Sequence, residues 1–97
     1  MSVHVYIPTP FRRATHNQAR VSAHADSVRA LLDELEGSFS GLRGLLRDEQ
    51  GDVPRHVNIY VNGEAIEVLQ GLATPLRDGD EVAIIPALAG GAARERA

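Results

Sequence analysis

Residues 57–63 read VNIYVNG and combine a strand pattern with a hairpin turn. Apolar residues at 57, 59 and 61 alternate with other types, the period of two that is typical of a strand with one buried face. The pair Asn62-Gly63 is typical of a tight hairpin, because both residues tolerate a positive φ. The stretch therefore predicts a strand over 57–61 that returns as a short strand over 65–69.

Three further strands are predicted around this hairpin. Alternation over 3–7 and over 19–25 predicts two strands that pair with each other, and alternation over 81–85 predicts the last strand. Pro8 and Pro10 follow the first strand, so residues 12–18 are expected to be irregular.

Helical spacing of apolar residues separates the second strand from the hairpin. Asp26 or Ser27 is predicted to cap this helix and Gly37 to end it. Helical spacing resumes over 39–46 and predicts a second short helical segment. The residues predicted to share the buried face of the first helix are Val28, Leu31, Leu32 and Leu35.

The order strand, strand, helix, strand, short strand, strand predicts a β-grasp fold of the α+β class. A mixed sheet of about four to five strands packed on one main helix is the simplest way to bury these apolar faces. The folded domain is predicted to span 1–86, with a tail at 87–91 and an extension at 92–97. A chain of 97 residues suffices for one core of this kind.

Composition excludes several classes of protein. The chain has no cysteine, which rules out a thiolate nucleophile, a thiolate metal site and a disulfide framework. A net charge of −3 and few aromatic residues give no support for a nucleic-acid partner. No apolar run approaches the roughly 20 residues of a membrane-spanning helix. No signal-peptide pattern is present either, so a cytoplasmic location without membrane contact is expected.

Two sets of polar residues are expected to be structural. The four histidines lack the spacing of metal ligands, so no metal site is predicted. Asp78, Asp80 and Glu81 surround Gly79, where acidic residues and glycine are favoured by turn geometry. We therefore expect turn roles for these carboxylates rather than acid–base chemistry.

The stretch after Pro86 holds the chemistry to which the sequence points. It reads Ala87-Leu88-Ala89-Gly90-Gly91, and two adjacent glycines without Cβ atoms can enter a channel too narrow for side chains. Five extended residues reach roughly 17 Å at about 3.3 Å per residue, enough to bring a carboxylate into a neighbouring active site. Such a carboxylate is a weak electrophile and needs activation, for example as an acyl-adenylate made from ATP.

Several blocks of the sequence carry a resemblance to a known family. Residues 76–86, LRDGDEVAIIP, followed by Gly90-Gly91, resemble the end of the ubiquitin-like sulfur carriers of the MoaD and ThiS type. Residues 5–9, 57–62 and 71–74 look most similar to the carriers of an actinobacterial cysteine-biosynthesis route. These blocks in order are far more specific than a diglycine alone.

The resemblance implies a carrier that is acted on by enzymes and is not itself an enzyme. An E1-like enzyme adenylates the terminal glycine, here Gly91, with ATP, and a sulfur donor converts the adenylate to a thiocarboxylate. In the cysteine route the thiocarboxylate attacks an activated serine on a pyridoxal-phosphate-dependent cysteine synthase. A JAMM-type zinc metalloprotease then releases the cysteine. The carrier has no catalytic residue and binds no cofactor.

This chain departs from the family pattern because it continues beyond the diglycine. We predict cleavage between Gly91 and Ala92, which removes residues 92–97, and recognition of Leu88, Ala89 and Gly90 by the partner. Ile85, together with Leu88 and Tyr60, is predicted to form an apolar patch that docks a partner enzyme.

Three alternatives remain open at this point. The chain could be the small subunit of molybdopterin synthase, which delivers sulfur to a pterin precursor in a large subunit. It could be a protein modifier that is linked through Gly91 to lysines of other proteins. It could also be a β-grasp binding module whose tail is inert.

Overall fold

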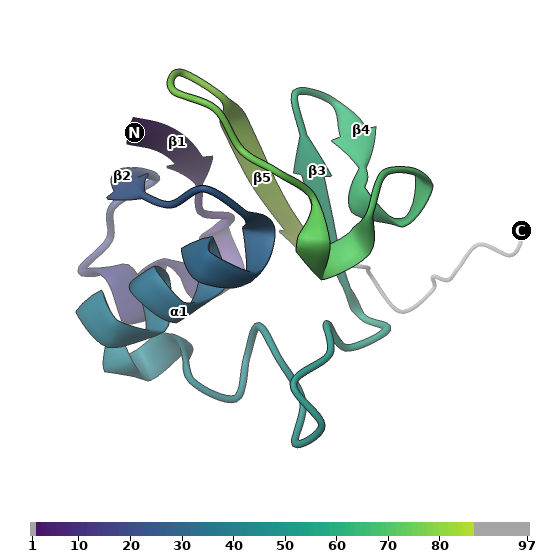
Figure 1. Cartoon of the computed structure of the whole chain (residues 1–97). Helices are drawn as coiled ribbons and strands as arrows, with labels where there is room; N and C mark the ends of the chain where they lie inside the picture. Colours follow the sequence, from purple (N-terminus) through teal and green to yellow (C-terminus); the bar gives the residue numbers. More distant parts are fainter. Residues whose placement is uncertain (1, 87–97) are drawn as a thin grey trace, which may run out of the picture.

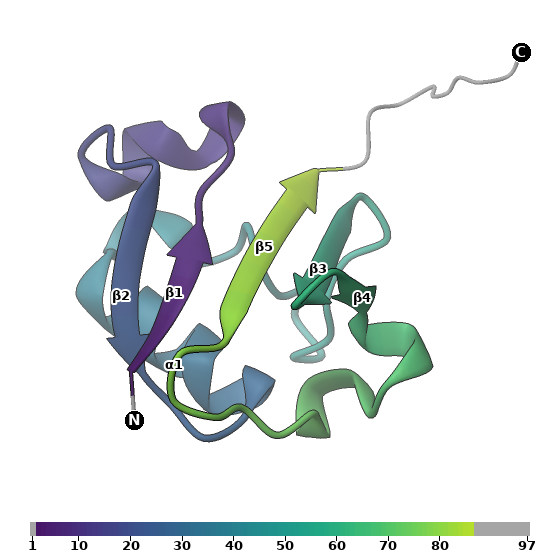
Figure 2. The same cartoon turned by 90° about the horizontal axis from the view of Figure 1, so that it is seen from above.

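Five strands form one mixed sheet in the order β2-β1-β5-β3-β4. The computed structural model describes residues 2–86 (Figure 1). The strands lie side by side in this order in Figure 2. The strands are β1 (Ser2–Tyr6), β2 (Arg20–His24), β3 (Val57–Val61), β4 (Glu64–Ala65) and β5 (Glu81–Pro86), and the helix is α1 (Val28–Ser38). Short 3₁₀ turns are η1 (Thr9–Thr15), η2 (Ser40–Leu42), η3 (Ile66–Val68) and η4 (Gly71–Ala73).

The alternating residues of the central strands bury one face of the sheet. On β1 and β5 every second side chain is fully or almost fully buried, and these side chains join one core with the apolar stripe of α1. The predicted β-grasp arrangement, one sheet on one main helix, is therefore confirmed. The residues of this central layer are Val3, Val5, Val82 and Ile84 from the sheet and Val28, Leu31, Leu32 and Leu35 from the helix.

Ser27 begins α1, and Phe39 ends it. The Ser27 hydroxyl accepts a hydrogen bond from the backbone N–H of Ala30 at 3.1 Å, which settles the capping residue. The prediction that Gly37 ends the helix was wrong, because α1 continues to Ser38. The backbone N–H of Phe39 still donates to Leu35, and its ring packs against the core, so tertiary packing overrides the glycine signal.

Three other sequence expectations are corrected by the structure. Residues 12–18 are not all irregular, because residues 12–15 belong to η1. This turn begins at Thr9 and has Pro10 in its first positions, where proline is tolerated. The second helical segment over 39–46 is reduced to η2, because the backbone becomes extended at Arg43 and Gly44 then adopts a positive φ of 82°. The strand over 65–69 stops at Ala65, because Ile66 turns inward and is buried.

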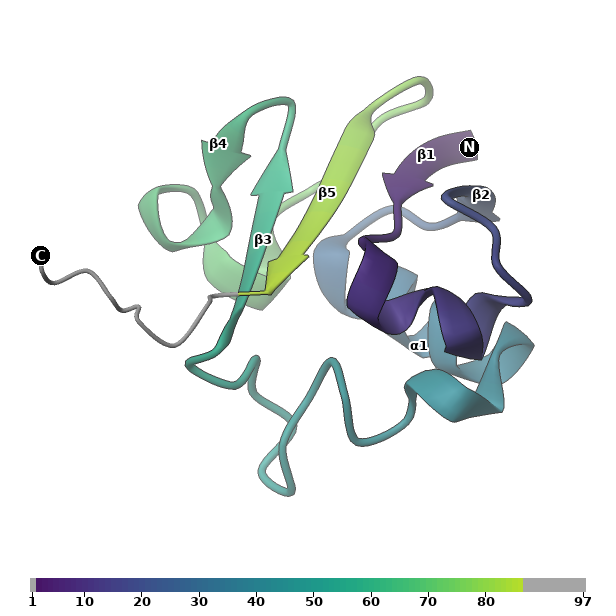
Figure 3. The ribbon, with the colours of Figure 1, turned by 180° about the vertical axis from the view of Figure 1, so that it is seen from behind.

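β5 lies between β1 and β3 and fixes which residues of the outer face are neighbours. β1 runs parallel to β5, with Tyr6 opposite Ala83. β3 runs antiparallel to β5, with Tyr60 also opposite Ala83. Because β1 and β5 are parallel, their carboxyl ends meet at the same edge of the sheet. η1 follows β1 at this edge, and it contacts η2 close to the end of α1 (Figure 3).

Gly37 and Gly41 offer a matched pair of substitutions for testing the packing around α1. A Cβ atom at Gly37 meets nothing within 4 Å, so Gly37→Ala should raise the free energy of unfolding by about 0.5–1 kcal/mol through helix propensity. At Gly41 the same atom would lie 3.0 Å from the Ala14 Cβ, so Gly41→Ala should lower it by about 1 kcal/mol. Urea unfolding measures the free energy of unfolding of both variants. Equal changes in the two variants would contradict the close packing of η1 on η2.

Candidate functional site

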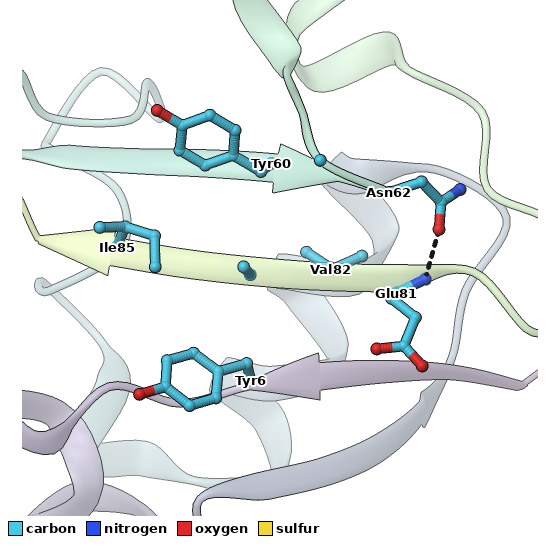
Figure 4. Close-up of a pocket in the computed structure, with 8 residues that line it drawn as sticks. Tyr6, Tyr60, Asn62, Glu81, Val82 and Ile85 are labelled. Carbon is cyan, nitrogen blue, oxygen red and sulfur yellow. Dashed lines mark hydrogen bonds between the residues drawn. The ribbon is translucent and has the colours of Figure 1, made fainter.

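Apolar and aromatic side chains gather on the outer face of the sheet, opposite α1. They line a shallow hollow of about 610 Å³ over β1, β5 and β3. Figure 4 shows Tyr6, Ile85 and Tyr60 on these three neighbouring strands, with both hydroxyl groups directed toward the end of β5 where Ile85 lies. Tyr6 and Ile85 keep 39% and 37% of their surface exposed, so the hollow offers apolar area to a partner.

Ala83 forms the floor between the two tyrosines. It lies opposite both tyrosines in the strand register, so three side chains form one row across the sheet. Two strand spacings of about 4.8 Å put the tyrosine Cα atoms roughly 10 Å apart. The small alanine therefore leaves a slot between two larger aromatic walls.

Arg12 from η1 holds Tyr6 in place. The Nε atom of Arg12 donates to the backbone oxygen of Ile7 at 3.0 Å, and its Nη2 lies 3.4 Å from the Tyr6 hydroxyl. The Arg12 Cζ atom is 5.8 Å from the centre of the Tyr6 ring, a cation–π contact. The chain thus places a guanidinium group at the edge of the hollow.

The other end of the hollow is polar and is tied to the hairpin turn. The Asn62 side chain accepts from the backbone N–H of Glu81 at 3.0 Å (Figure 4) and donates to Asp80 at 3.0 Å. The second carboxylate oxygen of Asp80 accepts from the backbone N–H of Arg77 at 2.8 Å. The hydrogen bond from Arg77, followed by that from Asn62, lowers the pKa of Asp80 below its ordinary value.

The turn roles predicted for Asp78 and Asp80 are confirmed, whereas the turn role predicted for Glu81 was wrong, because Glu81 is the first residue of β5. Asp78 accepts a hydrogen bond from the backbone N–H of Ser2 at 2.8 Å, which ties the start of β1 to the turn before β5. Glu81 forms an exposed ion pair with Arg20 across the sheet at 3.3 Å. Each carboxylate is thus occupied by local backbone groups or by a neighbouring cation.

The structure brings together only part of the predicted site. Ile85 and Tyr60 share the hollow, as expected, whereas Leu88, Ala89, Gly90, Gly91 and Ala92 lie outside the described residues. Tyr6 was missed as a member of the patch. Its outward position was visible in the alternation of the first strand, but its neighbours depend on the parallel pairing of β1 with β5.

Neither a cluster of metal ligands nor a membrane-spanning helix occurs within residues 2–86. This part of the chain contains no group of three histidine, aspartate or glutamate side chains placed to hold a metal ion. His4 lies 3.4 Å from the hydroxyl of Ser22 on the outer face. None of the helices described is both long and apolar enough to cross a membrane.

A five-stranded β-grasp sheet packed on one helix, with an exposed apolar hollow over its last strand, is the architecture of a ubiquitin-like protein. The model of the ThiS family matches residues 5–91, which is most of the chain. The chain belongs to the ThiS family of ubiquitin-like sulfur carriers.

Sulfur carrier proteins named CysO are similar to this chain in both sequence and structure. The sulfur carrier protein CysO of Mycobacterium tuberculosis is 46% identical over 93 residues, covering 94% of this chain and 100% of CysO. Its crystal structure matches with a TM-score of 0.84 at 44% identity, over 89% of this chain and 99% of that one. The Amycolatopsis orientalis BexX/CysO complex contains a chain matching with a TM-score of 0.85 at 36% identity, over 92% and 99%.

A third relative carries a different name. The small archaeal modifier protein 3 of Haloferax volcanii is 45% identical over 65 residues, covering 67% of this chain and 70% of the relative. These proteins are named as carriers and modifiers rather than as enzymes.

The lowered pKa of Asp80 predicts a pH dependence of stability. Its folded pKa is below its unfolded pKa of about 3.9, so its stabilisation is complete above that pH and is lost as pH falls through the folded pKa. Thermal melting from about pH 5 to about pH 2 should therefore show a smaller loss of stability in Asp80→Asn than in the parent chain. An equal pH dependence in both proteins would contradict a stabilising role for the hydrogen bonds that Asp80 accepts from Arg77 and Asn62.

Proposed function

We propose that the chain carries sulfur on the carboxyl group of Gly91. Removal of residues 92–97 by a JAMM-type zinc metalloprotease frees this carboxylate. An E1-like enzyme then joins it to the α-phosphate of ATP, and pyrophosphate leaves. Sulfide from a sulfur donor attacks the acyl carbon, AMP leaves, and a thiocarboxylate remains.

The observation that carries this proposal is the extent of the family match. The ThiS model ends at Gly91, so residues 92–97 lie beyond the part of the chain that the family shares. The relative that is 46% identical is named a sulfur carrier protein. Both observations support the diglycine as the working end and the last six residues as an addition to be removed.

The product that we propose for the donated sulfur is cysteine. The likeness to CysO extends along nearly the whole chain, and it supports delivery to an activated serine on a pyridoxal-phosphate-dependent synthase. The thiocarboxylate sulfur would bond to the β-carbon of the serine as its activated hydroxyl group leaves. A shift of the acyl group from sulfur to the amine would then leave cysteine joined to Gly91 by a peptide bond. The protease would release that cysteine and restore the carboxylate. The carrier itself would need no bound cofactor.

The outer-face hollow supports the partner half of the proposal. Ile85 is adjacent to Pro86, the last described residue before the tail. An enzyme docked on the hollow would therefore be close to the point where the tail begins. A relative of this chain has been crystallised in complex with a second protein, BexX. We assign the hollow to docking of the activating and acceptor enzymes.

A second candidate function is protein modification. It is favoured by the 45% identity to small archaeal modifier protein 3 over two thirds of the chain. In that case the activated Gly91 would be joined to lysine amines of other proteins. Adducts that survive reduction and contain the diglycine remnant on lysine would distinguish this function from sulfur transfer.

Intact mass of the protein from its native cell tests the carrier function. We expect loss of residues 92–97 and a mass gain equal to one oxygen-to-sulfur exchange, which a thiol-alkylating reagent then traps. Gly91→Trp should abolish the sulfur gain, because its side chain cannot enter a channel shaped for glycine. Persistence of the unmodified full-length chain under sulfur demand would refute the carrier function.

Ile85→Glu tests the docking role of the hollow. The variant places a charge on the apolar surface and should raise the KM for activation by about tenfold, with little change in kcat. Val68→Glu is the matched control, since Val68 is 75% exposed and lies outside the hollow. Pyrophosphate release by the E1-like enzyme gives both constants. Equal KM values for the two variants would place docking elsewhere.

A further inference from the structure

The size of the slot over Ala83 and the charges at its two ends indicate which chemical group can bind there. Its floor is a methyl group that is only half-buried, and its walls are the Tyr6 and Tyr60 rings. Those walls rise from strands on either side of β5, with tyrosine Cα atoms roughly 10 Å apart. One apolar side chain, aliphatic or aromatic, fits between two such rings, because aromatic rings pack with their centroids about 4.5–7 Å from a neighbouring ring.

The charges at the two ends of the slot differ. Glu81 at the hairpin end is already paired with Arg20. Arg12 at the other end donates to a backbone oxygen and stacks on Tyr6, but its guanidinium has no carboxylate partner within residues 2–86. The cation is held in a fixed position and is available to an anion from outside.

We infer that Ala83 and Arg12 set the specificity of docking, and that they select an enzyme surface presenting one apolar side chain beside a carboxylate. The apolar side chain enters the slot over Ala83, and the carboxylate pairs with Arg12. Because these two contacts lie at different places along β5, together they fix the orientation of the partner relative to Pro86. This inference rests on the proposed function.

Ala83→Leu fills the slot while leaving the core untouched. The added side chain can pack between the two rings, so the melting temperature should be unchanged or raised. The KM for activation by the E1-like enzyme should rise by roughly tenfold or more, because the partner's side chain is excluded, while kcat stays constant. Ala83→Ser keeps the size of the floor and should retain nearly the parental KM.

Arg12 and Arg13 provide a matched comparison for the charged contact. They are adjacent in η1 and carry the same charge, but only Arg12 touches Tyr6. Arg12→Ala should raise the KM by roughly three- to tenfold and weaken its dependence on salt, whereas Arg13→Ala should do neither. Unchanged melting temperatures would show that the effect is on docking.

The outcomes separate this inference from the proposed function. The experiment starts from the full-length chain, which the protease of the same cell trims to end at Gly91. The trimmed protein is then assayed with the E1-like enzyme of that cell. If the parent is activated and Ala83→Leu keeps the parental KM, the slot is refuted while the carrier function stands. Equal effects of Arg12→Ala and Arg13→Ala would refute the charged contact. If the parent itself releases no pyrophosphate, the proposed function fails and the inference falls with it.

Discussion

The parallel pairing of β1 with β5 is the constraint on which the rest of the structure depends. A parallel pair cannot be closed by a tight turn, so the whole middle of the chain must connect the two strands and return on the correct side. α1 then covers one face of the pair, and β2 and β3 extend it on either side. The same pairing places Tyr6 beside Ala83 and so forms one wall of the hollow that extends along β5.

The two faces of β5 have different roles, one in packing the core and the other in forming the exposed hollow. Val82 and Ile84 point into the core and are almost completely buried, so they hold the strand between its neighbours. Ala83 and Ile85 alternate with them and face outward, where they can change without opening a cavity. A single strand therefore provides both the rigidity of the sheet and the surface that we propose a partner recognises, and it keeps that surface in a fixed position relative to Pro86.

Much of the fold could be predicted because its signals are local. Alternation on β1, β3 and β5 and the Asn62-Gly63 hairpin are visible within short windows of sequence. The helix end predicted at Gly37 was wrong because the packing of Phe39 determines where α1 ends. The strand predicted beyond Ala65 was wrong because Ile66 is buried in the core. Tyr6 joins the hollow only through pairing with a strand at the far end of the chain, which no local pattern reports.

The hydrogen bond from Ser2 to Asp78 has a practical consequence for handling the molecule. It fixes the start of β1 beside the turn that precedes β5, at the opposite end of both strands from Ile85. A fluorophore or affinity tag joined ahead of Ser2 would therefore lie at the end of the sheet where Glu81 and Asn62 line the hollow. The reporter group would be separated from Ile85, at the apolar end where we propose that a partner docks.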